Sequence, residues 1–303
     1  DVDRISPEAP VPVITKTRRE NRLGGAANVA LNIKALGAEP LLASVIGNGD
    51  KAELFKNLLQ NNHLSKHGVY ESNNRATTIK TRIISHGQQL LRIDEEESEW
   101  LDPDTENAFL NHLLYIMSSE RLNAIVFEDY DKGCITPNII EQVVAQSRKQ
   151  GIPTLVDPKK RNYLHYKHVS LFKPNFKELV EGLNLNHLEK TDNEGILRAV
   201  RAMHKEQDIE WMMVTLSEAG IFMSNQTEFK RIPARIRDIS DVSGAGDTII
   251  SIAATGIAAR MSPWIIAELS NLGGGQVCEK AGVVPVNRDQ LLKEGEEFIR
   301  GPV

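Results

Sequence analysis

A polar, glycine-spaced stretch at residues 241–247 could bind an anion and hold a base beside it. It reads Asp-Val-Ser-Gly-Ala-Gly-Asp, and small and branched apolar residues follow it up to Arg260. The apolar run predicts a buried helix whose first backbone N–H groups are free and whose N-terminus is electropositive. Gly244 and Gly246 remove side chains where an anion would approach the backbone. Asp247 can accept a proton there, and phosphoryl transfer to a hydroxyl requires both features.

A plain glycine turn explains the same stretch. In that interpretation Asp247 is an ordinary acidic residue in the first turn of a helix, where it complements the helix dipole. Short glycine motifs also occur in many unrelated proteins. The stretch alone therefore favours neither interpretation, and other parts of the chain must decide between them.

Further polar clusters follow four predicted strands, at 124–128, 154–157, 169–173 and 211–216. In an open parallel sheet, ligands bind beyond the carboxyl ends of the strands. Repeated polar clusters at such ends, together with Asp247, therefore predict a single site. The residues in these clusters that could carry chemistry are Lys132, Asp157, Lys159, Asn175, Glu178, Thr215 and Ser217.

Asn175 and Glu178 stand three positions apart at a predicted helix start, so both side chains can face one point. An amide and a carboxylate there suit a hydrated Mg²⁺ ion on a nucleotide, because Mg²⁺ keeps several of its waters. A helix capping box has the same spacing and explains the pair equally well. Near the N-terminus, Gly24, Gly25 and Asn28 could bind sugar hydroxyls or simply open a helix.

Composition and charge exclude several classes of protein. The 303 residues are 41% hydrophobic and 25% charged, which is typical of globular chains. A net charge of −5 does not suggest a nucleic-acid or acidic-membrane partner. The two cysteines are far apart and form no metal or redox motif, and no apolar run reaches membrane-spanning length. We therefore expect a cytoplasmic protein.

Predicted strands and helices alternate from residue 26 onward, which predicts an α/β fold with a mostly parallel sheet covered on both faces. Two β-rich segments, 1–20 and 75–93, break this alternation. We expect them to pair into one small sheet that serves as a lid over the site or as a dimer interface. The main domain would then comprise 21–74 and 94–303. The second segment predicts a hairpin with Ser85, His86 and Gly87 at its tip.

Several of these stretches together resemble the ribokinase-like (PfkB) sugar kinases. The motifs are DRISPEAPVP (3–12), RLGGAANVA (22–30), LLRID (90–94), DYDKG (129–133), DPK (157–159), KPNFKE (173–178) and DVSGAGD (241–247). The resemblance covers almost the whole chain. It is strongest to the branch that phosphorylates D-glycero-β-D-manno-heptose 7-phosphate at O1, a step toward ADP-heptose for bacterial lipopolysaccharide. It implies a three-layer α/β/α sandwich with a small β-sheet lid.

The resemblance also implies roles for individual residues. Asp247 would be the catalytic base, and the N–H groups of Gly244, Ala245 and Gly246 would form the anion hole. ATP would be the phosphoryl donor, with Mg²⁺ held by Asn175 and Glu178 largely through water. The nucleotide would contact Asn175, Glu178, Thr215, Ser217, Gly220 and Asn271. The sugar phosphate would contact Gly24, Gly25, Asn28, Arg92, Lys132, Asp157 and Lys159.

The same resemblance makes K⁺ a candidate monovalent cofactor and predicts a homodimer through the lid. Ser217 departs from the family pattern, because glycine is commoner at that position. The first strand of the family, with an Asp that binds sugar hydroxyls, is expected before Asp1. Two alternatives stay open: another sugar or sugar-phosphate kinase of this family, and a relative that binds ligands without catalysis.

Overall fold

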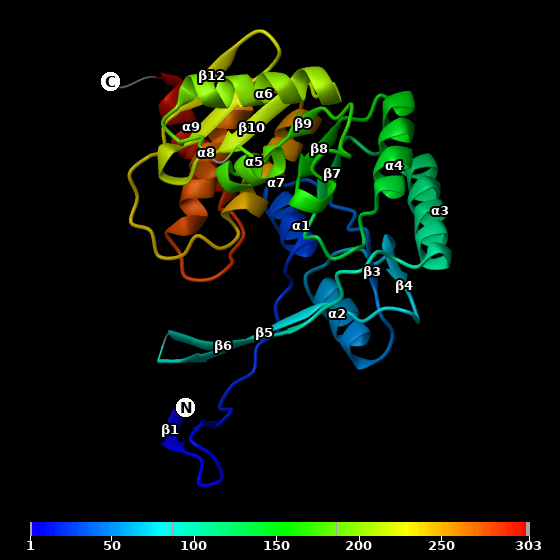
Figure 1. The fold of residues 1–303 in the computed structure, drawn as a ribbon, viewed down its shortest axis with the longest axis vertical. Helices are drawn as coiled ribbons and strands as arrows, with labels where there is room; N and C mark the ends of the chain where they lie inside the picture. Colours follow the sequence, from blue (N-terminus) through cyan, green and yellow to red (C-terminus); the bar gives the residue numbers. More distant parts are fainter. Residues whose placement is uncertain (1, 87, 186, 301–303) are drawn as a thin grey trace.

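Helices and strands alternate along most of the chain in the computed structural model, which describes residues 2–86, 88–185 and 187–300 (Figure 1). The strands are β1 (Val2–Ile5), β2 (Pro12–Ile14), β3 (Ser44–Ile46), β4 (Val69–Glu71), β5 (Ile79–Ser85), β6 (Gln88–Glu95), β7 (Ile125–Glu128), β8 (Thr154–Asp157), β9 (Leu171–Phe172), β10 (Trp211–Thr215), β11 (Ile221–Ser224) and β12 (Phe229–Ile232). The α-helices are α1 (Ala26–Ala35), α2 (Asp50–Asn61), α3 (Pro103–Ser119), α4 (Pro137–Gln150), α5 (Phe176–Leu183), α6 (Asn193–Gln207), α7 (Ala245–Ala258), α8 (Pro263–Cys278) and α9 (Arg288–Arg300).

The central sheet is mostly parallel. Among the described residues it has six strands in the order β12-β11-β10-β9-β8-β7. Strands β7 to β10 run parallel to their neighbours, whereas β11 and β12 are added antiparallel. The carboxyl ends of four parallel strands therefore lie along one edge of the sheet. In the strand register, Glu128 at the end of β7 is the partner of Asp157 at the end of β8.

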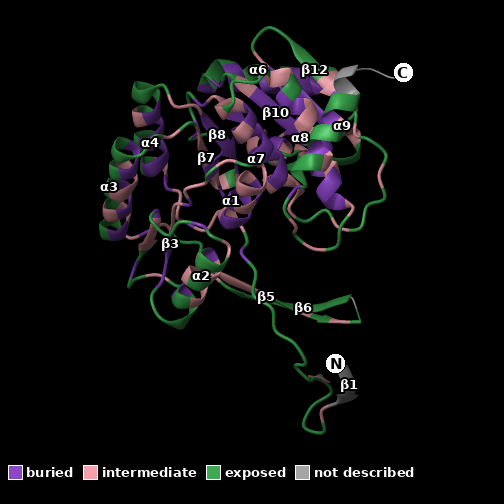
Figure 2. Ribbon diagram, turned by 180° about the vertical axis from the view of Figure 1, so that it is seen from behind, coloured by how far each residue is buried: buried purple, intermediate pink, exposed green. Residues whose placement is uncertain are grey.

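Helices cover both faces of this sheet. Leu155 and Leu171 pack toward α1, α7 and α8. Their neighbours Val156 and Phe172 point the other way, toward α3, α4, α5 and α6. This alternation explains why the strands are apolar throughout, since both of their faces are buried (Figure 2). The three-layer α/β/α sandwich predicted from the sequence is thereby confirmed.

Helix α7, which begins at the glycine-spaced turn, is buried between the sheet, α1 and α8. Most of its residues are buried, as its apolar sequence predicted. Close packing against α8 depends on Gly274, because a Cβ there would lie 2.8 Å from the side chain of Ile249. Within the described ranges, no helix is both long and apolar enough to cross a membrane.

Strands β5 and β6 form a hairpin that projects from the three layers, and β1 and β2 form a second small sheet near the N-terminus (Figure 1). The prediction that segments 1–20 and 75–93 pair into one sheet is wrong for the described residues. Each pair of strands closes on itself, so the facing backbone groups of the two strands bond to each other without a distant segment. Gly87, placed at the predicted tip, lies outside the described residues.

Strand β3 spans three residues and pairs in parallel with β4. No sequence pattern predicted β4. With three residues, Val69–Glu71, this strand is too short to show a periodicity of two. Together with α2, these strands form a small unit that packs on α1 through Leu42 and Leu59.

Candidate active site

The N-terminus of α7 presents backbone N–H groups that no other described residue uses. Gly244, which caps the helix, adopts a left-handed conformation with φ of 83°. Within the described ranges, no acceptor contacts the N–H groups of Gly246 and Asp247. A Cβ added to Gly246 would lie 3.7 Å from Lys173 Nζ, so an ammonium group lies behind this turn. Free donors at a helix N-terminus beside an ammonium group fit an anion such as a phosphate.

Asp247 is held through both of its carboxylate oxygens. Asn28 Nδ2 donates to Oδ2 over 2.7 Å, and the Tyr130 hydroxyl donates to Oδ1 over 2.9 Å. Burial raises the pKa of Asp247 above the usual value of an aspartate, and these two hydrogen bonds oppose the rise. A carboxylate with a raised pKa and a fixed orientation is suited to act as a base.

Charged side chains from the strand ends lie next to Asp247. Lys173 Nζ is 2.7 Å from Asp157 Oδ2, and both side chains are buried. Glu128 Oε2 is also buried and has no partner among the described residues. Burial, together with the charges of Asp157 and Asp247, raises the pKa of Glu128 well above its usual value. The site therefore contains a buried ion pair beside a carboxyl group whose protonated form is favoured.

Asn175 and Glu178 form the capping box of α5, which was one of the two explanations for their spacing. Asn175 Oδ1 accepts from the Glu178 backbone N–H over 2.9 Å, and Glu178 Oε2 accepts from the Asn175 N–H over 2.8 Å. The other Glu178 oxygen pairs with Lys159. No group of three or more His, Cys, Asp or Glu side chains in the described ranges could hold a metal ion. Two residues already engaged in this way fit Mg²⁺ through its water molecules rather than as direct ligands.

Thr215, Ser217 and Gly220 lie at the end of β10 and on the loop that follows. Thr215 forms an isolated parallel bridge with Asn175, so the loop lies beside the start of α5. Gly220 has φ of 86°, and a Cβ there would overlap a backbone carbonyl of β12. Asn271 is placed differently, on α8, where its side-chain amide donates to a loop carbonyl over 2.8 Å.

Ser217 adopts a left-handed conformation with φ of 55°, at the position where the family resemblance predicts glycine. This conformation strains a residue that carries a Cβ. Replacing Ser217 by glycine should therefore raise the free energy of unfolding by about 0.5–1 kcal/mol, after the extra backbone entropy of glycine is subtracted. Urea denaturation of the two proteins measures the difference.

The matched control is Ser118→Gly, on the exposed surface of α3. Glycine disfavours helix, so this change should lower the free energy of unfolding by up to about 1 kcal/mol. Two Ser→Gly changes of opposite sign isolate the backbone conformation as the cause. A stability loss in Ser217→Gly would contradict the strain argument.

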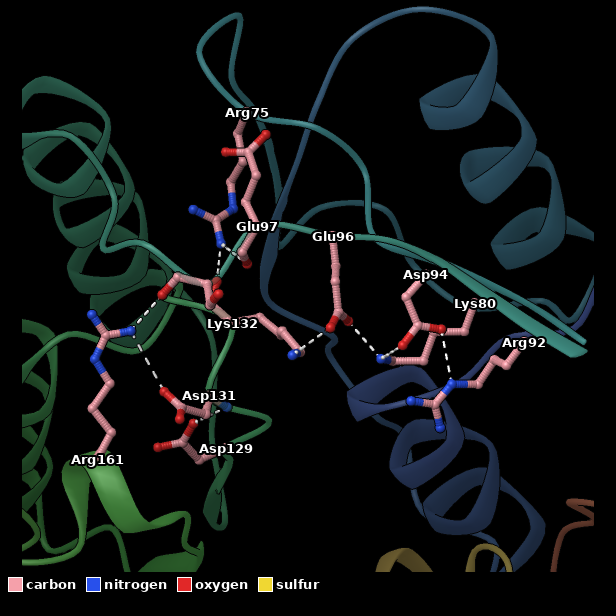
Figure 3. Close-up of polar contacts among 11 residues, drawn as sticks. Arg75, Lys80, Arg92, Asp94, Glu96, Glu97, Asp129, Asp131, Lys132 and Arg161 are labelled. Atoms are coloured by element: carbon pink, nitrogen blue, oxygen red, sulfur yellow. Dashed lines mark hydrogen bonds and ion pairs between the residues drawn. The ribbon is translucent and has the colours of Figure 1, made fainter.

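Arg92 and Lys132 are joined by a chain of alternating charges at the base of the hairpin (Figure 3). Lys132 pairs with Glu96 over 2.7 Å, and Lys80 pairs with both Glu96 and Asp94. Asp94 then pairs with Arg92 over 3.0 Å. The loop after β7 is thereby connected to the projecting hairpin. Both cations already have carboxylate partners, and no described contact joins either of them to Asp247.

The structure brings some predicted residues together and leaves others apart. Asn28 and Asp247 are in direct contact, and the Tyr130 ring lies over Gly25, whose added Cβ would be 3.5 Å from it. A Cβ on Gly24 would meet no atom within 4 Å, so space is open beside the glycine pair. Lys159 lies with the α5 group, whereas Arg92, Lys132 and Asn271 lie elsewhere.

Three side chains around Asp247 were assigned no role from the sequence: Glu128, Tyr130 and Lys173. Each lies at or just after the end of a parallel strand, the position where polar residues were expected to gather. Tyr130 and Lys173 also lie within two of the motifs that carry the family resemblance. Their position at the strand ends could have identified them. A single tyrosine or lysine in a sequence, however, does not by itself indicate a catalytic role.

Residues 1–289 match the pfkB family of carbohydrate kinases. The chain belongs to this family. A relative named bifunctional protein HldE, from Syntrophotalea carbinolica, is 36% identical over 293 residues, which are 95% of this chain and 58% of the relative. This pfkB-family chain therefore spans under two thirds of that relative's length. The family resemblance found in the sequence is confirmed.

Solved structures share the fold of this pfkB-family chain. Phosphofructokinase-2 from Escherichia coli, in complex with potassium, superposes with a TM-score of 0.77 at 20% identity, covering 99% of this chain and 94% of that one. Ribokinase from Arabidopsis thaliana, complexed with ribose and ATP, superposes with a TM-score of 0.71 at 19% identity, covering 94% and 91%. At such identities the likeness extends to the ribokinase-like fold alone.

Proposed function

We propose that this chain transfers the γ-phosphoryl group of ATP to O1 of D-glycero-β-D-manno-heptose 7-phosphate. The observation that carries the proposal is the Asp247 carboxylate, held by Asn28 and Tyr130 at the mouth of a free helix N-terminus. The choice of heptose rests on the sequence motifs and on the relatives named HldE. A cytoplasmic location is part of the proposal, because ATP and two free cysteines suit that compartment.

In the proposed reaction, the sugar oxygen attacks the γ-phosphorus while the bond to the β-phosphate oxygen breaks. Asp247 accepts the hydroxyl proton, and Asn28 keeps its carboxylate oriented. The N–H groups at Gly244–Asp247 stabilise the charge of the transferred group. Asn175 and Glu178 would hold Mg²⁺ through water, and the ion would neutralise charge on the phosphates. The loop with Thr215, Ser217 and Gly220, and Asn271 on α8, are the proposed nucleotide contacts.

The proposed sugar site lies between Gly24, Gly25 and Asn28 on one side and Asp157 on the other. The 7-phosphate of the sugar would be bound by Arg92, Lys132 and Lys159. Each of these cations is paired with a carboxylate here, so binding of the phosphate requires an exchange of partners. The pair of Arg92 is the most exposed of the three, and exposed ion pairs are typically worth below about 1 kcal/mol, so a phosphate dianion can compete for its cation.

A panel of acceptors tests the proposal directly. We expect phosphate transfer from ATP to heptose 7-phosphate with a kcat/KM at least about 100-fold above that for fructose 6-phosphate. A site whose polar groups match the hydroxyls of one sugar discriminates strongly against a sugar that leaves those groups unpaired. Ribose, which lacks a phosphate, should be poorer still. The assay with and without K⁺ reports whether a monovalent cation contributes.

Two outcomes would favour the alternatives. Efficient transfer to fructose 6-phosphate or ribose would identify another sugar kinase of the family. Tight ATP binding with no transfer to any acceptor would identify a ligand-binding relative. In both cases the heptose assignment would be abandoned.

We further propose that segments 1–20 and 75–93 form a lid and that β5 and β6 join two copies of the chain. The hairpin projects from the body (Figure 2), and its strand β6 is exposed along its length whereas β5 is partly buried. Leu91 and Ile93 lie on one face of it and are about half exposed, at 50% and 46%. An isolated two-stranded hairpin is marginally stable in water, and an apolar face on it favours a partner. A second copy is the proposed partner.

Replacing both Leu91 and Ile93 by lysine should convert a dimer into a monomer, because like charges would face each other across the interface. Sedimentation velocity measures the change in mass. The control is Leu164→Lys, which changes a leucine that is 54% exposed outside the hairpin and should leave the dimer intact. A wild-type monomer, or a dimer that persists in the double variant, would exclude this interface.

A further inference from the structure

Tyr130 connects the proposed sugar site to the proposed base. Its ring lies against Gly25, at 3.5 Å from the position of an added Cβ, and its hydroxyl donates to Asp247 Oδ1 over 2.9 Å. The residue comes from the loop directly after β7, two positions beyond Glu128. Its ring and its hydroxyl therefore contact two parts of the site that are more than 200 residues apart in sequence.

The two side chains that donate to the Asp247 carboxylate differ in their exposure. Asn28, which donates to Oδ2, is buried at 2% exposure, whereas Tyr130, which donates to Oδ1, is 37% exposed. We therefore expect a hydroxyl that gives its proton to Asp247 to approach from the side of Tyr130, the more exposed donor. Each carboxylate oxygen can accept two hydrogen bonds. The acceptor hydroxyl can thus either join the Tyr130 hydroxyl at Oδ1 or displace it.

The phenol cannot readily take the phosphoryl group itself. Burial, together with the charges of Asp247 and Glu128, raises the pKa of Tyr130 well above its usual value. The hydroxyl therefore keeps its proton and remains a weak nucleophile. It can still donate to the base, and it then occupies one of the two acceptor positions of Oδ1, which leaves one position instead of two for water.

We propose that Tyr130 is a positioning residue, which orients Asp247 for transfer and restricts the access of water to Oδ1 until the acceptor arrives. This inference rests on the proposed function. In productive turnover the sugar oxygen bonds to the γ-phosphorus, ADP leaves and the proton goes to Asp247. In the side reaction that Tyr130 suppresses, the oxygen of water bonds to the γ-phosphorus and ADP and phosphate leave. Both reactions need only ATP and a hydroxyl compound.

Replacing Tyr130 by phenylalanine tests this role, because the ring against Gly25 is kept and only the hydroxyl is lost. ATP hydrolysis without any sugar should rise at least about fivefold, and kcat for transfer should fall about tenfold with little change in the KM for sugar. The acidic limb of the kcat/KM profile should move up by about one pH unit, since loss of a donor raises the pKa of Asp247 further. A purely structural role would produce none of these changes.

Three further variants complete the test. Tyr115→Phe, at an exposed tyrosine on α3, should leave every readout unchanged. Tyr130→Met removes the same hydroxyl with a different side chain and should also raise hydrolysis, so a packing defect in one variant cannot mimic the effect. Asp247→Asn combined with Tyr130→Phe should abolish the added hydrolysis, because water then lacks a base.

The hydrolysis measurement needs no sugar and is therefore independent of the acceptor assignment. If heptose 7-phosphate proves to be the wrong substrate, hydrolysis and its pH profile still report on Tyr130. Unchanged hydrolysis in both hydroxyl-deleted variants, with an unshifted acidic limb, would overturn the inference even if the heptose assignment holds.

Discussion

Replacing Asp247 by asparagine should lower kcat for phosphate transfer by about three to four powers of ten, because the amide cannot accept the acceptor's proton. Asparagine has the same shape, so the contact with Asn28, now 2.7 Å long, can be kept. The dissociation constant for ATP should change by less than about threefold if the role of Asp247 is confined to the transition state. Steady-state kinetics and equilibrium nucleotide binding measure the two quantities separately.

The matched control is Asp289→Asn, which makes the same chemical change at an exposed position in the first turn of α9. Its turnover should equal that of the wild type. Turnover in Asp247→Asn within about tenfold of the wild type would remove Asp247 from the role of base, since such small losses are typical of misplaced groups rather than of a lost base. Equal unfolding midpoints would show that the comparison concerns chemistry and not stability.

Replacing Lys173 by methionine should lower the free energy of unfolding by about 3–5 kcal/mol, because one partner of a buried ion pair is removed. Lys173 lies 2.7 Å from Asp157, and neither side chain reaches solvent to any extent. The change would leave the charge of Asp157 buried beside Glu128, without the ion pair that compensates it. Chemical denaturation followed by circular dichroism measures the loss.

Two comparisons sharpen this result. Lys190→Met removes a lysine from a more exposed pair with Glu218 and should cost less than about 1 kcal/mol. Asp157→Asn added to Lys173→Met removes the uncompensated charge and should recover part of the stability. If Lys173→Met lowers the free energy of unfolding by less than about 1 kcal/mol, the buried ion pair does not make the expected contribution to stability.

The polar clusters at strand ends were predicted to form one site, and the structure shows why only part of each cluster is available. The Asp129 carboxylate accepts from Tyr166 and from Asn162, each over 2.9 Å, so it joins the loop after β7 to the segment after β8. Lys159 is similarly paired with Glu178. A sequence pattern locates such residues at the sheet edge but does not reveal which contacts they make.

Local patterns by themselves determined the fold class and most element positions of this protein. Strand and helix periodicity, the Thr136 cap of α4 and the Asn175–Glu178 spacing are all set within a few residues of chain. Such features depend on local backbone preference and on the pattern of apolar residues, and both can be read from the amino-acid sequence. The predicted three-layer sandwich and the glycine-spaced start of α7 follow from them.

Tertiary structure alone decided what the catalytic stretch contacts. The Asp247–Asn28 bond joins residues 219 positions apart, and the partner of each cation depends on which loops pack together. It also decided that β1–β2 and β5–β6 close as separate hairpins, because local closure competes with distant pairing. The physical reason is common to both: hydrogen bonds and ion pairs between distant residues form only after the chain has packed, and their energies depend on the resulting burial.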